Sequence, residues 1–302
     1  MLGPVASAGD NLILARFTTT GAVDQGFGDD GVFSVPVGDG AGGAASLIVQ
    51  KDAKLLVLGT TNKECCSDRF YLARLTRDGG FDSTFDGGLI TGNLADLDSY
   101  NERRAAWALV LQLDGKLVFV VAGDDSNGQF RTRLVRYKPA GTQDLTFGGQ
   151  GVVSPPFLVN AIVVQPSDGK LVVVGKSWNG TDFDFALARY RLNGTLDPNF
   201  GGGDGIVTTK LGSGDDSAEH VVIVNGQFVV AGKSFNGTDF DSLLVRYTSS
   251  GAVNLSFGSD GIVRAPISIN ALTVQPNGRV VAAGKPTSSS GMSGFALARF
   301  LP

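Results

Sequence analysis

Residues 161–210 read AIVVQPSDGK LVVVGKSWNG TDFDFALARY RLNGTLDPNF GGGDGIVTTK, and this stretch decides the fold. It contains four strand-length apolar runs, which are separated by Asp-Gly, Asn-Gly or Gly-rich turns. Asp-Gly or Asn-Gly between two apolar runs is the strongest short-range indication of a β-hairpin. The stretch therefore predicts four consecutive antiparallel strands.

The same pattern recurs along the chain with a period of roughly 57 residues. An apolar-apolar-Arg-apolar signature occurs six times, with its arginines 58, 62, 53, 57 and 53 residues apart. These arginines are Arg16, Arg74, Arg136, Arg189, Arg246 and Arg299. A turn of the form Gly-x-x-Asp-x-x-Phe-Gly follows each of the first five, with its ring at Phe27, Phe85, Phe147, Phe200 and Phe257. A third signature, an apolar run closed by a Gln-Pro-x-Gly-Lys type of turn, begins near Ala45, Ala108, Ala161, His220 and Ala271.

Several of these strands are apolar at every position, as in residues 161–164 and 171–174. Such strands must be covered on both faces, because an alternating pattern would be expected if one face met water. A period of 40 to 60 residues with four strands per unit is typical of propellers. We therefore predict an all-β fold, a β-propeller of four-stranded antiparallel blades.

The number of blades depends on how the two ends of the chain are used. Residues 12–35 resemble the last two strands of a blade and residues 269–285 the first two, so pairing of the N- and C-terminal strands would close a ring of five blades. One Arg strand is then spare, and it could instead belong to a sixth, incomplete blade or be completed by a neighbouring subunit. The prediction is one domain over residues 1–302, with repeat units 41–95, 96–155, 156–210 and 211–265 and partial units 12–40 and 266–302.

Composition narrows the function classes. The chain has 43 Gly in 302 residues, and its 25 basic and 29 acidic residues are scattered, which argues against a nucleic-acid partner. No apolar run approaches the roughly 18 residues needed to span a bilayer, so we expect no membrane insertion. The first seven residues lack the features of a secretion signal. The two cysteines, Cys65 and Cys66, are adjacent, so no disulfide framework is predicted and the redox compartment stays open.

The repeated Arg and Phe are predicted to be structural. An arginine inside an apolar strand is costly to bury alone, and the Asp of the following turn is its natural partner. Asp197 would serve Arg189 in this way, whereas Asn254 replaces the acid after Arg246. The equivalent acids are Asp24, Asp82 and Asp144. The phenylalanines are expected to fill the space between adjacent blades.

The motifs at Gln165 to Gly175, Phe185 to Tyr190 and Gly194 to Gly201 together resemble the bacterial delta-60 repeat, a β-propeller repeat of unknown function. The resemblance extends from about Asn11 to Phe300. Residues 215–232 depart from it through a shorter turn, and residues 92–106 are an insertion. The resemblance implies a secreted or cell-surface bacterial protein, often a module of larger adhesive or structural chains, and implies no known activity.

Two loops, residues 176–184 and 233–241, match almost residue for residue and place an aromatic ring beside amide, hydroxyl and carboxylate groups. An aromatic ring with convergent polar groups suits a sugar. The candidate ligand-binding residues are Trp178, Asn179, Asp182, Phe235, Asn236 and Asp239. The alternative is an Asn-Gly turn whose ring packs on the next blade.

The sequence offers few residues that could form a catalytic centre or a metal site. His220 is the only histidine, no nucleophile-elbow motif accompanies it, and one His with two adjacent Cys does not supply a zinc site. The Asp-rich turns, such as Asp215-Asp216, do not follow the spacing of a calcium-binding EF-hand loop. No catalytic residue, metal or cofactor is predicted, although the carboxylates of the Asp-rich turns leave Ca²⁺ open as a ligand. A hydrolase with a carboxylate pair stays open, because the sequence does not show which acids converge.

The sequence thus favours a non-enzymatic extracellular scaffold or binding module, with self-assembly through strand exchange as an extension of that role. A lectin-like carbohydrate-binding propeller is the alternative, and a polysaccharide-active hydrolase comes third. The expected partners are proteins or further copies of the chain, and glycans under the alternative.

Overall fold

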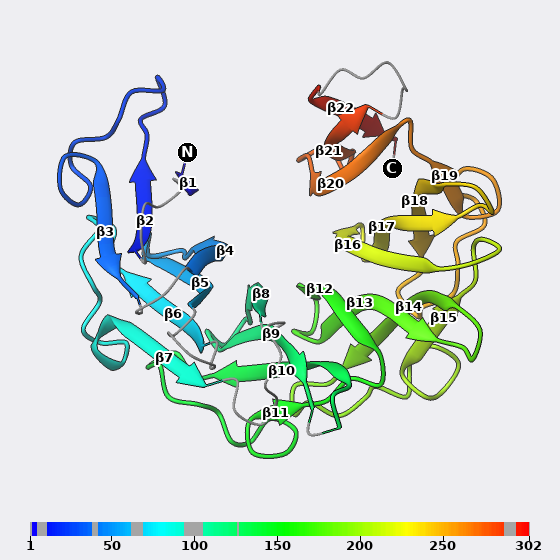
Figure 1. Cartoon of the computed structure of the whole chain (residues 1–302), viewed down its shortest axis with the longest axis horizontal. Coiled ribbons are helices and arrows are strands. Elements are labelled where there is room, and N and C mark those ends of the chain that lie inside the picture. Colours follow the sequence, from blue (N-terminus) through cyan, green and yellow to red (C-terminus); the bar gives the residue numbers. More distant parts are fainter. Residues whose placement is uncertain are drawn as a thin grey trace. The chain divides into compact units, whose positions relative to one another are not determined.

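The structure is a computed structural model that describes residues 2–4, 11–37, 42–61, 69–93, 105–125, 127–286 and 294–301. The chain divides into two compact units, Met1–Ser154 and Pro155–Pro302. Apart from one short 3-10 helix, η1 (Asp86–Gly88), the regular structure of the described residues consists of strands (Figure 1). Within these ranges, no helix has the length and apolar character needed to cross a membrane.

The first unit contains three antiparallel sheets with strands in chain order. The first sheet comprises β1 (Leu2–Pro4), β2 (Asn11–Arg16) and β3 (Val32–Pro36). The second comprises β4 (Gly42–Val49), β5 (Leu55–Thr61), β6 (Arg69–Leu75) and β7 (Leu89–Asn93). The third comprises β8 (Ala105–Leu111), β9 (Leu117–Asp124), β10 (Phe130–Tyr137) and β11 (Val152–Val153).

The second unit repeats this plan. One sheet comprises β12 (Leu158–Val164), β13 (Leu171–Trp178), β14 (Phe183–Tyr190) and β15 (Ile206–Thr209). The next comprises β16 (Asp216–Val224), β17 (Gln227–Phe235), β18 (Phe240–Tyr247) and β19 (Ile262–Arg264). The last comprises β20 (Ile267–Val274), β21 (Val280–Pro286) and β22 (Ala296–Phe300).

The predicted all-β architecture of four-stranded antiparallel meanders is confirmed. Four of the sheets formed by the described residues have four strands, and in each the Arg strand lies third, between the strand after the Gly-Lys turn and the strand after Phe-Gly. The number of blades, the closure of a ring and the single-domain boundaries stay predictions.

The first strand of each described sheet from β4 onward carries a bulge, and in four of these five strands it lies at an equivalent place. In β12 the register shifts between Val159 and Ala161, opposite Gly175 of β13. A Cβ atom added to Gly175 would lie 1.8 Å from the backbone oxygen of Leu158, so only glycine allows the two backbones to approach this closely. The same shift occurs opposite a glycine in β4, β16 and β20, whereas in β8 it lies farther along the strand, between Trp107 and Val110.

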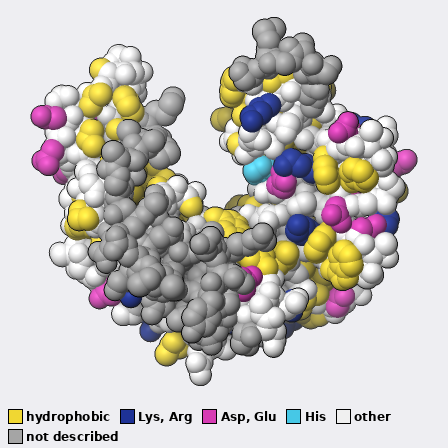
Figure 2. Space-filling model, viewed as in Figure 1, with side chains coloured by type: hydrophobic (Ala, Val, Ile, Leu, Met, Phe, Trp, Pro, Cys, Tyr) yellow, Lys and Arg dark blue, Asp and Glu magenta, His cyan; other side chains and the backbone are white. Residues whose placement is uncertain are grey.

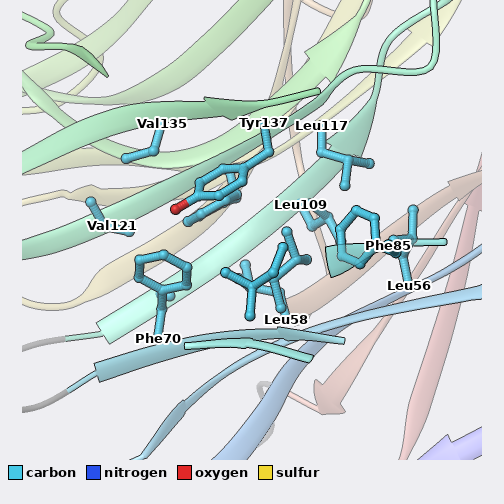
Figure 3. Close-up of a cluster of buried hydrophobic side chains, with 13 residues drawn as sticks. Leu56, Leu58, Phe70, Phe85, Leu109, Leu117, Val121, Val135 and Tyr137 are labelled. Atoms are coloured by element: carbon cyan, nitrogen blue, oxygen red, sulfur yellow. The ribbon is translucent and has the colours of Figure 1, made fainter. Parts of the chain in front are cut away.

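The core lies between successive sheets of a unit. Figure 3 shows such a cluster, in which Leu56, Leu58 and Phe70 of the second sheet face Val121 and Tyr137 of the third. The ring of Phe70 meets that of Tyr137 edge-on, with centroids 6.0 Å apart. The repeated phenylalanines belong to this layer and are all buried: Phe27, Phe85, Phe147, Phe200 and Phe257.

Each repeated arginine from Arg16 to Arg189 pairs with the aspartate of the following turn. Arg189 Nε lies 2.8 Å from Asp197 Oδ2, and both side chains are buried. Arg189 also covers the Phe200 ring at 4.8 Å, and Lys170 Nζ lies 3.0 Å from Asp197 Oδ2. Equivalent arrangements form at Arg74 with Asp82 and Lys54, and at Arg136 with Asp144 and Lys116. Two cations therefore share one buried carboxylate in three repeats.

These carboxylates stay ionised at neutral pH. Burial by itself raises the pKa of Asp197, but hydrogen bonds from Lys170 and the Asn199 backbone, together with the charge of Arg189, outweigh it and hold the pKa below its usual value. The pKa of Asp82 and that of Asp144 are lowered in the same way, with hydrogen bonds from Thr84 and Thr146 respectively.

The same arginines also join one sheet to the next. Arg189 Nη1 donates to the backbone oxygen of Ser249 at 2.7 Å, and Arg74 Nη1 donates to that of Pro139 at 2.6 Å. Arg16 Nη1 contacts the backbone oxygen of Arg77 in the same way. In each case the acceptor lies three residues after the arginine of the next repeat. We call this contact the inter-repeat latch.

The repeat of Arg246 departs from the pattern. Asn254 stands at the place of the acid and Gln227 at that of the lysine, and Asn254 Nδ2 donates to Gln227 Oε1 at 2.9 Å. The buried Nε of Arg246 has no hydrogen-bond partner in the structure. Its guanidinium lies 5.7 Å from the Phe257 ring, farther than the other repeated arginines lie from their rings. This repeat lacks the ion pair that the others possess.

Restoring the acid is expected to stabilise the second unit. Asn254→Asp places a carboxylate at the position that holds arginine Nε in the other repeats, and we expect a gain of about 1–2 kcal/mol in the free energy of unfolding, the size of a hydrogen bond between charged groups. Urea unfolding of the two proteins measures this difference in the free energy of unfolding. Asn193→Asp adds the same charge in an exposed turn and should change stability by less than about 0.5 kcal/mol. A less stable Asn254→Asp protein would contradict the prediction.

Candidate functional site

The two matching loops lie at the ends of hairpins β13–β14 and β17–β18 of the second unit. Trp178 and Phe183 form the last cross-strand pair of one hairpin, and Phe235 and Phe240 that of the other. The ring centroids are 5.1 Å apart in the first pair and 5.3 Å in the second. Side chains opposite one another on antiparallel strands stabilise the hairpin, so each end carries a paired aromatic platform.

Part of each platform is open to solvent. Trp178 is 57% exposed and Phe240 56% exposed, whereas Phe183 and Phe235 are half-buried beneath them. Lys176 Nζ lies 4.5 Å from the Phe183 ring, so a cation lies over the ring that Trp178 contacts edge-on. A large exposed indole on a supported ring is an unusual surface for a soluble fold.

The turn that follows Trp178 is held by Asn179. Its Oδ1 accepts hydrogen bonds from the backbone N–H groups of Thr181 and Asp182, at 2.9 and 3.1 Å. Its Nδ2 donates to Asp182 Oδ1 at 2.5 Å and to Asp184 Oδ2 at 3.0 Å. The equivalent Asn236 accepts from the backbone of Thr238 and of Asp239. Both turns are therefore locked by their own side chains.

Asp182 is buried and charged. Lys210 Nζ lies 3.0 Å from its Oδ2. The hydrogen bond from Lys210, followed by that from Asn179, holds the pKa of Asp182 below its usual value. Asp239, the equivalent residue of the second loop, is exposed. The two loops thus share the hydrogen bonds of the Asn turn and differ in the burial of the aspartate.

Residues 211–216 tie the two hairpin ends together. Asp216 Oδ2 accepts from the backbone of Leu211 at 2.7 Å, which folds the loop back on itself. Ser213 donates its backbone N–H to the Phe235 oxygen at 3.1 Å, and Asp215 Oδ1 accepts from the Phe183 backbone at 3.0 Å. Residues 211–216 therefore link the two loops that hold the six candidate residues.

Four further residues hydrogen-bond within these loops but were not among the predicted ligand-binding residues: Asp184, Lys210, Asp215 and Asp216. Asp216 could have been found by comparing repeats. By register with the bulge, Asp216 takes the place held by Phe157, directly before β12, and by Ile267 in β20, and all three are buried. An acid buried where the neighbouring repeats bury an apolar side chain is costly unless it serves the local structure or a ligand.

The other polar groups considered from sequence lie elsewhere. His220 is on β16 beside the bulge, and burial, the largest effect, lowers its pKa, so the ring is neutral at physiological pH. Figure 2 shows the histidine among acidic and basic side chains. Within the described ranges, no three His, Cys, Asp or Glu side chains are grouped to hold a metal ion. Cys65, Cys66 and residues 94–104 of the insertion lie outside the described residues.

A family model described as "Domain of unknown function (DUF5122) beta-propeller" matches residues 50–85, 112–147, 167–200 and 275–302. Each of the first three segments runs from the turn before the second strand, through the Arg strand, to the repeated phenylalanine. The model thus matches four repeats of the chain. The resemblance to a β-propeller repeat family of unknown function is thus confirmed.

Solved structures with some likeness to this repeat protein differ widely in their names. They include a protein of unknown function from Dyadobacter fermentans (9% identity, TM-score 0.49, covering 80% of this chain and 74% of that one). The extracellular domains 1-2 of Drosophila Semaphorin 1b match at 14% identity and TM-score 0.47, covering 86% and 53%. A GH43 endo-arabinanase from Bacillus licheniformis matches at 12% identity and TM-score 0.45, covering 85% and 92%. At TM-scores below 0.5 these likenesses carry no argument about activity. None of the curated proteins matches the chain.

Proposed function

We propose that this protein is a non-catalytic carbohydrate-binding module whose ligand surface lies at the ends of hairpins β13–β14 and β17–β18. The observation that carries the proposal is Trp178, a largely exposed indole on a turn locked by Asn179. The location that accompanies it is extracellular or on the bacterial cell surface, as the repeat resemblance implies.

The geometry supports a sugar ligand in particular. An exposed indole covers the apolar face of a sugar ring, and polar groups beside it take the hydroxyls. Asn179, Asp182 and Lys210 lie in one hydrogen-bonded network next to Trp178 and include an amide, a carboxylate and an ammonium group. Because the turn is already ordered, little conformational entropy is lost on binding.

The charge state of Asp182 does not suit the proton donor of a glycoside hydrolase. A glycoside hydrolase needs one carboxylic acid that keeps its proton near neutral pH. Asp182 has the opposite character, because Lys210 and Asn179 stabilise its ionised form. The surface therefore suits recognition of a hydroxyl-rich ligand.

Replacing Trp178 tests the proposal. We expect the intact protein to bind ligands on a broad glycan array, and Trp178→Ala to weaken that binding by about 30-fold or more, as loss of an aromatic anchor worth about 2 kcal/mol does. Isothermal titration with the best array ligand measures the change. Phe130→Ala, which removes a partly exposed ring from a hairpin of the first unit, is the matched control and should bind normally.

Two outcomes would contradict the proposal. The first is no binding of the intact protein to any glycan, and the second is equal binding by the Trp178→Ala and Phe130→Ala proteins. If the intact protein releases reducing sugar from polysaccharides and the Asp182→Asn protein does not, the protein is a hydrolase and not a binding module.

A further inference from the structure

The lysines that begin the two matching loops make different contacts. Lys176 Nζ lies over the Phe183 ring, at 4.5 Å from its centroid. Lys233 holds the equivalent place in the second loop, but its Nζ lies 2.9 Å from Glu219 Oε1 on β16. Phe240, the counterpart of Phe183, therefore has no cation over its ring among the described residues, and its side chain is 56% exposed.

The carboxylate that precedes Phe240 also lacks a cation. In the first loop the equivalent Asp182 pairs with Lys210 and receives a hydrogen bond from Asn179. Asp239 is exposed, and within the described ranges its side chain forms no ion pair and no hydrogen bond. The second loop thus presents an exposed ring and an exposed carboxylate, each without the lysine that its counterpart in the first loop contacts.

A further exposed carboxylate, that of Asp215, lies between the two hairpin ends. Its Oδ1 accepts from the Phe183 backbone at 3.0 Å, and its backbone oxygen accepts from the Phe235 backbone N–H at 3.0 Å. The Phe235 ring contacts that of Phe240, with centroids 5.3 Å apart. A ligand on the second aromatic pair therefore meets the charge of Asp215 as well as that of the loop itself.

The three segments that form these hairpin ends carry a net negative charge. Residues 176–184, 210–216 and 233–241 contain six aspartates and three lysines, which gives a net charge of −3. Glu219 and Arg264, which pair with residues of these segments, add one charge of each sign and cancel. Such a region attracts a cationic ligand and repels an anionic one.

Two of the aspartates are buried and incompletely hydrogen-bonded. Asp184 is 9% exposed and Asp216 0% exposed, and Oδ1 of each has no hydrogen-bond partner in the structure. Asn179 Nδ2 donates to the other oxygen of Asp184, and the Leu211 backbone N–H donates to that of Asp216. A buried carboxylate oxygen without a donor favours a positive charge nearby. This observation, independent of the exposed rings, also points to a cationic ligand.

We infer that the glycan bound at these hairpin ends carries free amino groups, as a polymer of glucosamine does. This inference rests on the proposed function and names its ligand. An ammonium group is attracted both by an aromatic face and by a carboxylate. The charged amine takes the place over Phe240 that Lys176 takes over Phe183. Asp239 supplies its counter-ion, and Trp178 covers a sugar ring of the same polymer. N-acetylated sugars lack the charge, and uronic acids carry the opposite one.

Isothermal titration of the whole chain tests the inference with two probes, a glucosamine oligosaccharide and the N-acetylglucosamine oligosaccharide of the same length. At a pH at which the free amine is protonated, we expect the glucosamine oligosaccharide to bind about tenfold more tightly. Asp239→Asn should abolish this preference, because it removes the charge and keeps the shape of the side chain. Asp260→Asn removes the same charge from an exposed turn beyond the other end of β18 and should retain the preference.

The outcomes separate this inference from the proposed function. Equal binding of the two oligosaccharides, with both weakened by Trp178→Ala, overturns the inference and leaves the glycan-binding role in place. An equal preference in the Asp239→Asn and Asp260→Asn proteins overturns it as well. A lysine-rich peptide that binds as tightly as the glucosamine oligosaccharide and displaces it would replace the amino sugar with a cationic peptide. Absence of binding to every glycan overturns both proposals.

Discussion

Asp197→Ala is expected to lower the free energy of unfolding of the second unit by about 3–5 kcal/mol, because it removes one partner of a buried ion pair and leaves the other charged. Arg189 and Lys170 both lose their carboxylate, at contacts of 2.8 and 3.0 Å. Removing Asp197 and Arg189 together would cost less, because the buried guanidinium would not be left without its carboxylate.

Urea unfolding followed by tryptophan fluorescence measures the loss, since Trp178 reports the second unit and Trp107 the first. Asp24→Ala is the matched control, because the same pair with Arg16 is partly exposed, and we expect a cost of about 1 kcal/mol or less. If the two substitutions cost the same, burial does not set the strength of the pair and the prediction is wrong.

The lowered pKa of Asp197 also sets the sign of the pH dependence. Its carboxylate adds stability above the pKa of an unfolded aspartate, about 3.9, and this contribution is lost as pH falls through the lower pKa of the folded protein. The Asp197→Ala protein should therefore lose less stability than the intact protein between about pH 5 and the acid range below pH 3.

Phe200→Ala is expected to cost about 3–5 kcal/mol, as is usual for a large buried ring. Phe200 is buried between two sheets, where its ring meets that of Phe228 edge-on at 6.0 Å and lies under the Arg189 guanidinium. The substitution leaves a cavity and also removes the ring that the cation covers.

Calorimetric or urea unfolding of the same unit measures this effect. Phe240→Ala removes an exposed ring from β18 and should cost less than about 1 kcal/mol. Phe200→Leu should recover most of the loss, because it refills the cavity with apolar atoms. A cost below 1 kcal/mol for Phe200→Ala would show that the repeated ring does not support the packing of successive sheets.

The parts of the fold that sequence predicted are those encoded locally. The hairpins follow from Asp-Gly and Asn-Gly turns between apolar runs, and the pairing of Arg189 with Asp197 follows from residues eight positions apart. Burial of β22 does not follow from sequence, because the same five residues are buried in residues 185–189 and exposed in residues 295–299. Whether such a strand is buried depends on the sheet that packs against it.

The residues of the candidate site also divide into those that a local sequence pattern predicts and those that it does not. Trp178, Asn179 and Asp182 were found because their loop recurs at residues 233–241. Lys210 contacts Asp182, which lies 28 residues earlier, and among the described residues this contact occurs in one repeat, so the repeat pattern did not predict it. The bridge from Asp215 to Phe183 likewise spans 32 residues and depends on how two sheets pack.

The inter-repeat latch has a consequence for folding during synthesis. The acceptors for Arg16, Arg74 and Arg189 lie 61, 65 and 60 residues farther along the chain. At a synthesis rate of about 5–20 residues per second, each of these arginines waits roughly 3–13 seconds after it is made before its last hydrogen bond can form. On the ribosome, each repeat therefore completes its buried contacts one repeat behind the growing end of the chain.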